Sequence, residues 1–215
     1  MSAPSPARAP ERVVLDGRYA RLEPIGPQHV ADLYRATEGQ EQRFTYLFEG
    51  APTSKQAMAD WVARASGMGD PLYFAVVDKS TGRAEGRQAL MRITPEHGVI
   101  EVGGIYWGPR MARSRVATEA LYLHARYVFD ELGYRRFEWK CNDLNEPSKV
   151  AATRFGFSDE GVFRQHMIIK GANRDTAWFS MVDGEWPAIK TGFERWLEPS
   201  NFDADGTQKT RLRSS

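Results

Sequence analysis

The stretch Trp107-Gly-Pro-Arg-Met-Ala-Arg-Ser-Arg-Val-Ala-Thr-Glu-Ala120 joins an apolar, β-branched run over 99–107 to a long amphipathic helical pattern. A strand that turns directly into a helix leaves free backbone N–H groups at the helix start, where the helix dipole favours negative charge. Three arginines, Arg110, Arg113 and Arg115, crowd this junction. The stretch therefore predicts either a phosphate or pyrophosphate site, or an ordinary strand–helix connection with a basic surface.

The helical pattern after this junction has a clear beginning and end. Ser114 is a natural N-cap, and Gly133 suits the turn that closes a helix. Between them, one face gathers Ala117, Ala120, Leu121, His124, Ala125, Val128 and Leu132. This spacing predicts a helix over 114–132 with one buried face.

Three strand patterns precede this helix. The runs 73–78, 83–94 and 99–107 are separated by turn signals at 79–82 and 95–98. Short turns between successive strands predict an antiparallel meander that leads into the helix.

The remaining patterns alternate between the two kinds of element. We expect further strands over 19–24, 136–141, 161–170 and 176–182, the last two joined by a turn at 171–173. We expect further helices over 26–37, 53–65, 147–155 and 185–197. This order predicts an α+β fold with a mostly antiparallel sheet and one βαβ crossover.

Length and composition predict one domain with tails. The chain has 215 residues, of which 41% are hydrophobic, enough for a substantial core. The segments 1–12 and 199–215 are polar or proline-rich and aperiodic, so we expect flexible tails around a domain at 13–198.

Charge and cysteine content exclude several classes of function. The 29 basic side chains nearly balance 28 acidic ones, so no overall field favours nucleic acid or an anionic membrane. The single Cys141 excludes an internal disulfide, and the four histidines lack metal-ligand spacing, so no metal is expected. No apolar run reaches transmembrane length and no secretory signal is visible, so we expect a cytoplasmic location.

Three segments, in this order, resemble the GNAT superfamily of acyl-CoA-dependent N-acetyltransferases, and most closely its Rim-type branch of ribosomal-protein alanine N-acetyltransferases. The run Val99-Ile-Glu-Val-Gly-Gly-Ile-Tyr-Trp107 is similar to the family's fourth strand. The run Ala112-Arg-Ser-Arg-Val-Ala-Thr-Glu-Ala-Leu121 is similar to its pyrophosphate loop and following helix. The run Asn145-Glu-Pro-Ser-Lys-Val-Ala-Ala-Thr-Arg-Phe-Gly-Phe157 is similar to its Asn-x-x-Ser segment.

The resemblance implies a GNAT-like sheet with helices on both faces and splayed fourth and fifth strands. It implies acetyl-CoA as co-substrate, with no metal, and a direct attack by a primary amine. The residues it places on the cofactor are Ile105, Tyr106, Trp107, Ala112, Arg113, Ser114, Arg115, Val116, Ala117, Asn145 and Ser148.

One departure from the family pattern concerns the pyrophosphate loop. The family reads Gln/Arg-x-x-Gly-x-Gly/Ala, whereas this chain reads Ala112-Arg-Ser-Arg-Val-Ala117. Arginine therefore stands where a glycine normally lets the backbone curl toward the pyrophosphate. Arg115 can still occupy the first helical position, and the additional arginines can pair with phosphates.

Glu101 is the candidate base. It interrupts an otherwise apolar strand, and strand alternation predicts that it shares a face with Gly103, Ile105 and Trp107. A carboxylate in such a setting suits proton abstraction, directly or through water, and the alternative is a glutamate at the rim of the sheet.

Ser148 is the candidate hydrogen-bond donor to the leaving thiolate. The resemblance implies this role, because Rim-type enzymes also place a serine after Asn-x-x. The tyrosine that many GNAT enzymes carry four residues before the Gly-Phe pair is Ala152 here. Asn145 is expected on the pantetheine chain. Alternatively, Ser148 caps a short helix and Asn145 is a turn residue.

The acceptor is expected to be a protein N-terminus or a small amine, and a homodimer is left open. The competing hypothesis is a non-catalytic acyl-CoA-binding or regulatory module on the same fold, which the altered loop and the missing tyrosine keep open. Fold-level likeness does not transfer a substrate.

Overall fold

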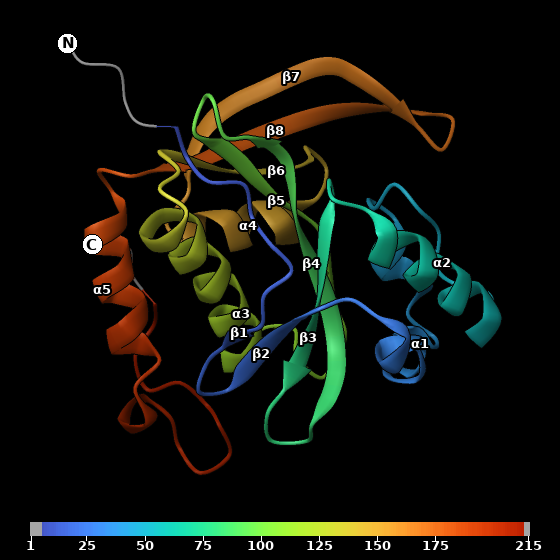
Figure 1. The fold of residues 1–215 in the computed structure, drawn as a ribbon, viewed down its shortest axis with the longest axis horizontal. Coiled ribbons are helices and arrows are strands. Elements are labelled where there is room, and N and C mark those ends of the chain that lie inside the picture. Colours follow the sequence, from blue (N-terminus) through green and yellow to red (C-terminus); the bar gives the residue numbers. More distant parts are fainter. Residues whose placement is uncertain (1–5, 213–215) are drawn as a thin grey trace.

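The computed structural model describes residues 6–212, which form one eight-stranded sheet flanked by helices (Figure 1). The strand order is β1-β2-β3-β4-β5-β6-β8-β7. Its members are β1 Leu15–Asp16, β2 Ala20–Pro24, β3 Leu72–Asp78, β4 Arg83–Thr94, β5 Val99–Trp107, β6 Arg136–Asn142, β7 Ser158–Ile169 and β8 Ala172–Val182. Every neighbouring pair is antiparallel except β5 and β6, which confirms the expected meander and single crossover.

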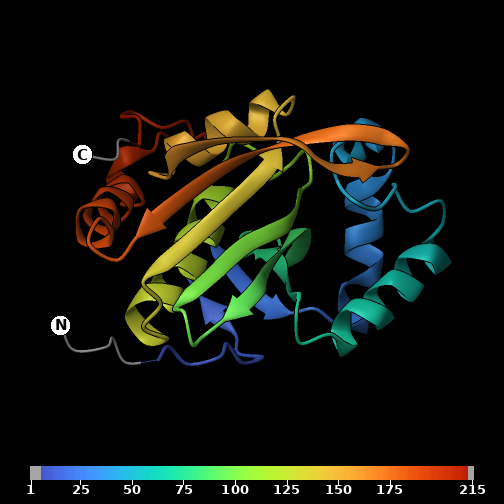
Figure 2. The ribbon, with the colours of Figure 1, turned by 90° about the horizontal axis from the view of Figure 1, so that it is seen from above.

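Helices cover both faces of the sheet, as expected (Figure 2). They are α1 Val30–Thr37, α2 Lys55–Gly67, α3 Arg115–Arg126, α4 Glu146–Arg154 and α5 Trp186–Trp196. The helices α1 and α2 lie together on one side, whereas α3 and α5 lie on the other. The expected helix over 114–132 is split, because α3 passes at Tyr127 into a π-helical turn that ends at Glu131.

The main core fills the side of the sheet covered by α3 and α5. Ile100 and Val102 of β5, with Phe137 of β6, are essentially inaccessible there. Leu121 and Val128, from α3 and its π-helical extension, belong to the same cluster. The two-residue period of the strands therefore turns alternate residues of β5 and β6 away from this core.

The parallel strands β5 and β6 separate after a short paired segment. Val99 to Val102 pair with Arg136 to Trp139, and no pairing follows. From Gly103 onward, the edge of β5 that faces β6 is therefore open, which confirms the expected splay.

A bulge in β5 alters the alternation that the sequence predicts. Two residues, Gly104 and Ile105, oppose the single residue Gln88 of β4, and Gly104 adopts φ +57°. Ile105 and Trp107 consequently pack against the core cluster on the α3 side. The expectation that they share a face with Glu101 is wrong, because the bulge shifts the period by one residue.

Two flanking details extend the sequence-based description. The β7–β8 turn lies at Lys170 and Gly171, both with positive φ, one residue earlier than expected. Phe202 and Leu212, which follow α5, and Ala7, which precedes β1, are buried against the domain. The domain limits 13–198 and the flexibility of the two tails remain predictions, and residues 1–5 and 213–215 lie outside the described part.

Candidate functional site

The loop before α3 presents backbone N–H groups at a helix start. Ser114 caps the helix, and its Oγ accepts hydrogen bonds from the N–H groups of Val116 at 3.1 Å and Ala117 at 3.5 Å. The N–H groups of Arg113 and Arg115 have no acceptor among residues 6–212. Two free N–H groups at the positive end of a helix can hold an anion.

The three arginines of this loop have different surroundings. Arg113 is exposed and adopts φ +64°, and Arg110 is exposed with a guanidinium nitrogen 3.9 Å from Glu85. Arg115 occupies the first helical position, as expected, but its guanidinium stacks over Tyr19 at 4.5 Å and Phe202 at 5.4 Å. Arg113 is therefore the loop arginine with the greatest freedom to meet a phosphate.

The last two side chains of β5, Tyr106 and Trp107, point to opposite sides of the sheet. Tyr106 is buried beneath Phe44, and its hydroxyl donates to the carbonyl oxygen of Ala36 at 2.6 Å. Trp107 packs edge-on against Trp139, with ring centroids 6.3 Å apart. The side chains of both residues are thus engaged in packing, and the strand offers a ligand its open backbone edge.

Asn145 and Ser148 lie at the start of α4. The Asn145 side chain caps this helix by accepting a hydrogen bond from the Ser148 N–H at 3.3 Å. The Ser148 Oγ accepts a hydrogen bond from Trp139 Nε1 at 3.0 Å, which leaves its own proton to donate. Burial raises the pKa of the neighbouring Cys141 thiol, an effect that the Ser148 side chain opposes.

Glu101 is buried on the side of the sheet opposite to Ile100 and Val102. Its Oε2 lies 2.7 Å from Arg92 Nη1 and 3.0 Å from Lys140 Nζ. Its Oε1 accepts no hydrogen bond from the described residues and points toward Gly103, where an added Cβ would lie 3.3 Å from it. The apolar setting expected for this carboxylate is wrong, since two cations hold one oxygen and leave the other free.

Glu101 and Ser148 lie on opposite faces of the sheet near the point where β5 and β6 separate. Glu101 pairs in register with Glu138, and the next pair is Val102 with Trp139. Glu101 therefore approaches this point from one face of the sheet, while Trp139 and Ser148 approach it from the other. The Arg113–Ala117 loop lies further along the chain, where the open edge of β5 ends.

Sequence reasoning missed the charged residues around Glu101. Lys140 Nζ lies 2.6 Å from Glu138 as well as 3.0 Å from Glu101, and Arg136 continues the chain of pairs to Glu160. The spacing of Arg136, Glu138 and Lys140 by two residues places them on one face of β6, and this signal was available in the sequence. The side that Arg92 faces could not be predicted from residue spacing, because Arg92 adopts φ +49° at an irregular position of β4.

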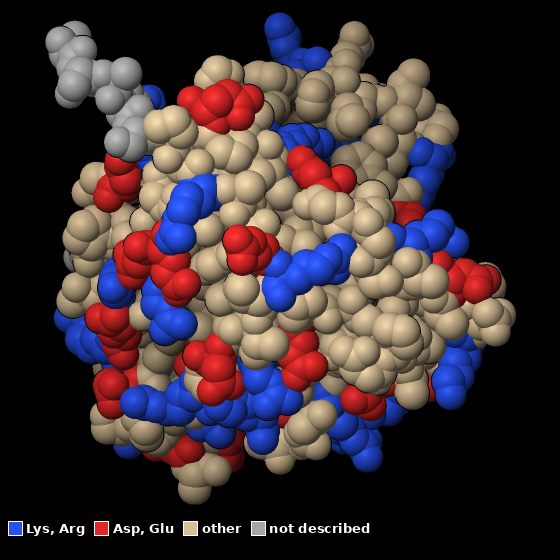
Figure 3. All heavy atoms as spheres, in the orientation of Figure 1, with Lys and Arg blue, Asp and Glu red and all other residues tan. Residues whose placement is uncertain are grey.

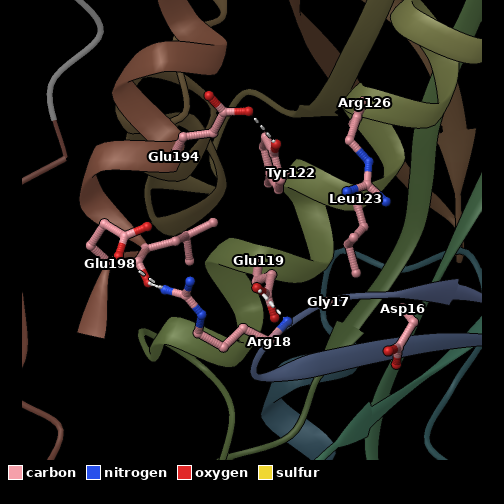
Figure 4. Close-up of a pocket in the computed structure, with 10 residues that line it drawn as sticks. Asp16, Gly17, Arg18, Glu119, Tyr122, Leu123, Arg126, Glu194 and Glu198 are labelled. Atoms are coloured by element: carbon pink, nitrogen blue, oxygen red, sulfur yellow. Dashed lines mark hydrogen bonds and ion pairs between the residues drawn. The ribbon is translucent and has the colours of Figure 1, made fainter.

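Glu119, on α3, has a structural role near a separate pocket of about 280 Å³ (Figure 4). Its carboxylate accepts hydrogen bonds from the backbone N–H groups of Arg18, Tyr19 and Ala20 at 2.9, 2.5 and 2.6 Å. It thereby fixes the turn between β1 and β2. None of the predicted site residues lines this pocket.

On the face drawn in Figure 3, basic and acidic side chains are interspersed and form no large patch of one charge. Within residues 6–212, no group of three or more histidine, cysteine or acidic side chains is arranged to hold a metal ion. No helix in the same range combines the length and apolarity that a bilayer crossing requires.

Comparison with known proteins identifies the family. The model of the "Acetyltransferase (GNAT) domain" family matches residues 20–158. A solved GCN5-related N-acetyltransferase from Brucella melitensis is 55% identical, with a TM-score of 0.94 over 96% of this chain and 95% of that one.

Two further relatives are more distant. The "Uncharacterized N-acetyltransferase p20" of Bacillus licheniformis is 28% identical over 117 residues, which span 53% of this chain and 63% of that protein. The solved ribosomal-protein-S5-alanine acetyltransferase from Vibrio fischeri is 16% identical, with a TM-score of 0.66 over 81% of this chain and 98% of that one. This last likeness concerns the fold alone. On the match to the family model and the likeness to the Brucella structure, the chain belongs to the GNAT acetyltransferase family.

Proposed function

We propose that this protein is an acetyl-CoA-dependent N-acetyltransferase whose acceptor is a primary amine, either a protein N-terminus or a small molecule. Glu101 is the base and Ser148 donates to the departing sulfur. The observation that carries the proposal is the separation of β5 from β6 after Val102, one residue beyond Glu101, with a free carboxylate oxygen of Glu101 beside Gly103.

The donor groups present suit coenzyme A. From Gly103 to Trp107, β5 pairs only with β4, so its second edge has backbone groups available to a pantetheine chain. The free N–H groups of Arg113 and Arg115 and the exposed Arg113 side chain suit a pyrophosphate. The Arg115 side chain, stacked on Tyr19, contributes backbone rather than charge in this proposal.

Acetyl-CoA supplies the acetyl group in activated form, as a thioester. Glu101 Oε1 takes a proton from the acceptor ammonium, directly or through water, so that the amine nitrogen becomes nucleophilic. As the N–C bond forms and the C–S bond breaks, a second proton leaves the nitrogen and departs with the thiol. The Ser148 hydroxyl, held by Trp139, donates a hydrogen bond to the sulfur as its negative charge develops.

The pairing of Glu101 also fits this role. Arg92 and Lys140 both contact Oε2, so the carboxylate is fixed in one rotamer while Oε1 remains available. A catalytic group that is already positioned needs little reorganisation when the substrate arrives.

The first experiment measures binding of acetyl-CoA by calorimetry and by the shift in unfolding temperature, with desulfo-CoA as a second ligand. We expect saturable binding and a rise in unfolding temperature that grows with ligand concentration. Thiol release is then followed across a panel of amino acids, amines and short peptides. Absence of binding at millimolar acetyl-CoA would overturn the proposal, and binding without turnover on any amine would favour an acyl-CoA-binding module.

A second experiment uses Ser148→Ala and Ser148→Cys. Loss of the hydroxyl should lower kcat about tenfold while leaving acetyl-CoA affinity nearly unchanged, because the hydrogen bond to sulfur strengthens only as the thiolate forms. An unchanged kcat in Ser148→Ala would remove Ser148 from the chemistry and leave it as a helix residue alone.

A further inference from the structure

Arg174, on β8, is a buried arginine without a carboxylate partner among residues 6–212. Only 7% of the residue is exposed. Its Nε donates to Thr176 Oγ1 at 3.2 Å, and its guanidinium lies 4.9 Å from the ring centroid of Phe48. It forms no ion pair with any residue in the described range 6–212.

Four other cations on this side of the sheet are paired with carboxylates. Their pairs are Arg87 with Glu49, Arg92 with Glu101, Lys140 with Glu101 and Glu138, and Arg136 with Glu138 and Glu160. Arg174 thus carries the one positive charge in this group that lacks a protein carboxylate within the described chain. A buried cation without a counterion is costly, so its retention indicates that a ligand supplies one.

Arg174 lies on the same face of the sheet as Glu101. Along β8, Arg174, Thr176 and Trp178 share a face, and Lys140 places its Nζ 3.8 Å from the Trp178 ring centroid. The same Nζ contacts Glu101, so these side chains form a continuous row from the candidate base to Arg174. Burial lowers the pKa of the Arg174 guanidinium, and the charges of Glu101 and Arg92 are close enough to influence it.

The β7–β8 hairpin extends over the side of the molecule that α1 and α2 occupy (Figures 1 and 2). Near its tip, Lys170 Nζ donates to the carbonyl oxygen of Phe44, which lies in the connection between α1 and α2. Phe48, in the same connection, covers the Arg174 guanidinium. The Arg174 guanidinium therefore lies between its own hairpin and the connection that joins α1 to α2.

We propose that Arg174 binds a carboxylate of the acceptor, so that the preferred substrates are amines that also carry a carboxylate. The inference rests on the proposed acetyltransferase function and deepens it. The acceptor amine would face Glu101 Oε1, and the acceptor carboxylate would pair with the guanidinium, whose two Nη groups make no hydrogen bond to the described residues. A planar guanidinium pairs bidentately with a carboxylate, which fixes orientation as well as charge.

Two kinds of acceptor share this chemistry, namely free amino acids and peptides with an acidic side chain near the N-terminus. Matched pairs separate them. The first pair is L-phenylalanine against L-phenylalaninamide, and the second is a hexapeptide with aspartate at its second position against the same peptide with asparagine. We expect kcat/KM to be at least about tenfold higher for the carboxylate member of one pair, since a charged bidentate contact is worth 10- to 100-fold, roughly.

The test variants are Arg174→Gln and Arg174→Lys, with Arg164→Gln as matched control. Arg164 is an exposed arginine of the neighbouring strand β7, so its loss removes the same charge from the same hairpin. Arg174→Gln should abolish the preference mainly through KM, Arg174→Lys should restore part of it, and Arg164→Gln should leave it unchanged. Unfolding temperatures and acetyl-CoA affinity are measured for each variant, so that a folding defect is recognised separately.

The outcomes separate this inference from the function on which it rests. Wild-type protein that binds acetyl-CoA and acetylates both members of each pair equally well would overturn the role of Arg174 while leaving the transferase intact. A carboxylate preference that persists in Arg174→Gln would overturn it as well. Failure to bind acetyl-CoA would instead overturn the proposed function itself.

Discussion

The two faces of β6 carry opposite chemistry on adjacent residues. Phe137 and Trp139 pack into the core on the α3 side, whereas Glu138 and Lys140 belong to the row of charges on the other side. Each face is internally consistent, since the apolar side chains meet other apolar groups and the charged ones meet opposite charges. One strand thus contributes at the same time to the stability of the fold and to the proposed acceptor side.

This difference shows how a short parallel pairing can position a reactive group. The core face fixes β5 and β6 over four registered pairs, Val99 to Val102 against Arg136 to Trp139. Packing on the core face fixes the backbone of β5, and therefore also positions Glu101 on the opposite face. The ion pairs with Arg92 and Lys140 hold its side chain as well. Substitutions on the two faces should therefore separate stability from activity.

The largest expected effect is a stability loss on the core face. Phe137 is fully buried, so Phe137→Ala should lower the free energy of unfolding by about 3–5 kcal/mol, through lost burial and a cavity. Glu138→Gln should cost much less, because Lys140 keeps Glu101 and Arg136 keeps Glu160 as partners. Urea denaturation of both variants checks the comparison, and equal losses would contradict it.

The second effect is a dependence of stability on pH that originates in the core. His124 is fully buried, and its Nδ1 accepts a hydrogen bond from Gln88 Nε2 at 3.0 Å. Burial lowers its pKa to about 3. Below its ordinary pKa of 6.5 the unfolded chain takes up a proton that the folded protein refuses, so stability falls as pH drops from 6.5 toward 3. The loss from this group is about 2 kcal/mol at pH 5.

The variant His124→Gln isolates this contribution. Its free energy of unfolding should fall less than that of the wild type between pH 7 and pH 5, although it starts lower because a buried contact is changed. Parallel pH curves for the two proteins would show that His124 does not titrate on unfolding in the way its burial indicates.

The smallest of the three stability effects concerns the bulge that reverses the faces of β5. Gly104 adopts φ +57°, and a Cβ added there would lie 2.8 Å from the Tyr73 ring. Gly104→Ala should cost about 1–2 kcal/mol for the left-handed backbone, with an additional cost if Tyr73 cannot move. The control is Gly184→Ala, at a position without positive φ where an added Cβ meets nothing within 4 Å. Thermal unfolding of both variants measures the difference, and a neutral Gly104→Ala would contradict the assigned bulge geometry.

The sequence predicted the elements well where local patterns decide them. Ser114 as N-cap and the meander of β3, β4 and β5 follow from local spacing and were confirmed. The helix expected over 114–132 begins as expected, but its α-helical part ends at Arg126. The bulge at Gly104 was not predictable in this way, because it is defined by the register with Gln88 on β4 rather than by the residues of β5 alone.

The site was predictable only in part, for the same physical reason. Glu101 was singled out as a charge in an apolar strand, yet its partners Arg92 and Lys140 come from neighbouring strands. Arg115 was expected near phosphate, whereas Phe202, far along the chain, helps to draw its side chain away. Contacts between distant segments depend on the fold, and local spacing carries little information about them.

The central claim is that the free oxygen of Glu101, at the point where β5 leaves β6, accepts the proton of the acceptor amine. The most direct measurement is kcat/KM for the best acceptor in Glu101→Gln and in Glu138→Gln, with acetyl-CoA affinity determined for both by calorimetry. Each substitution removes one carboxylate from Lys140. Glu138 has both oxygens engaged, by Arg136 and Lys140, whereas Glu101 keeps Oε1 free beside Gly103. We predict a loss of about 100-fold or more in Glu101→Gln, little change in Glu138→Gln, and unchanged acetyl-CoA affinity. Equal activities in the two variants, or full activity in Glu101→Gln, would contradict the account.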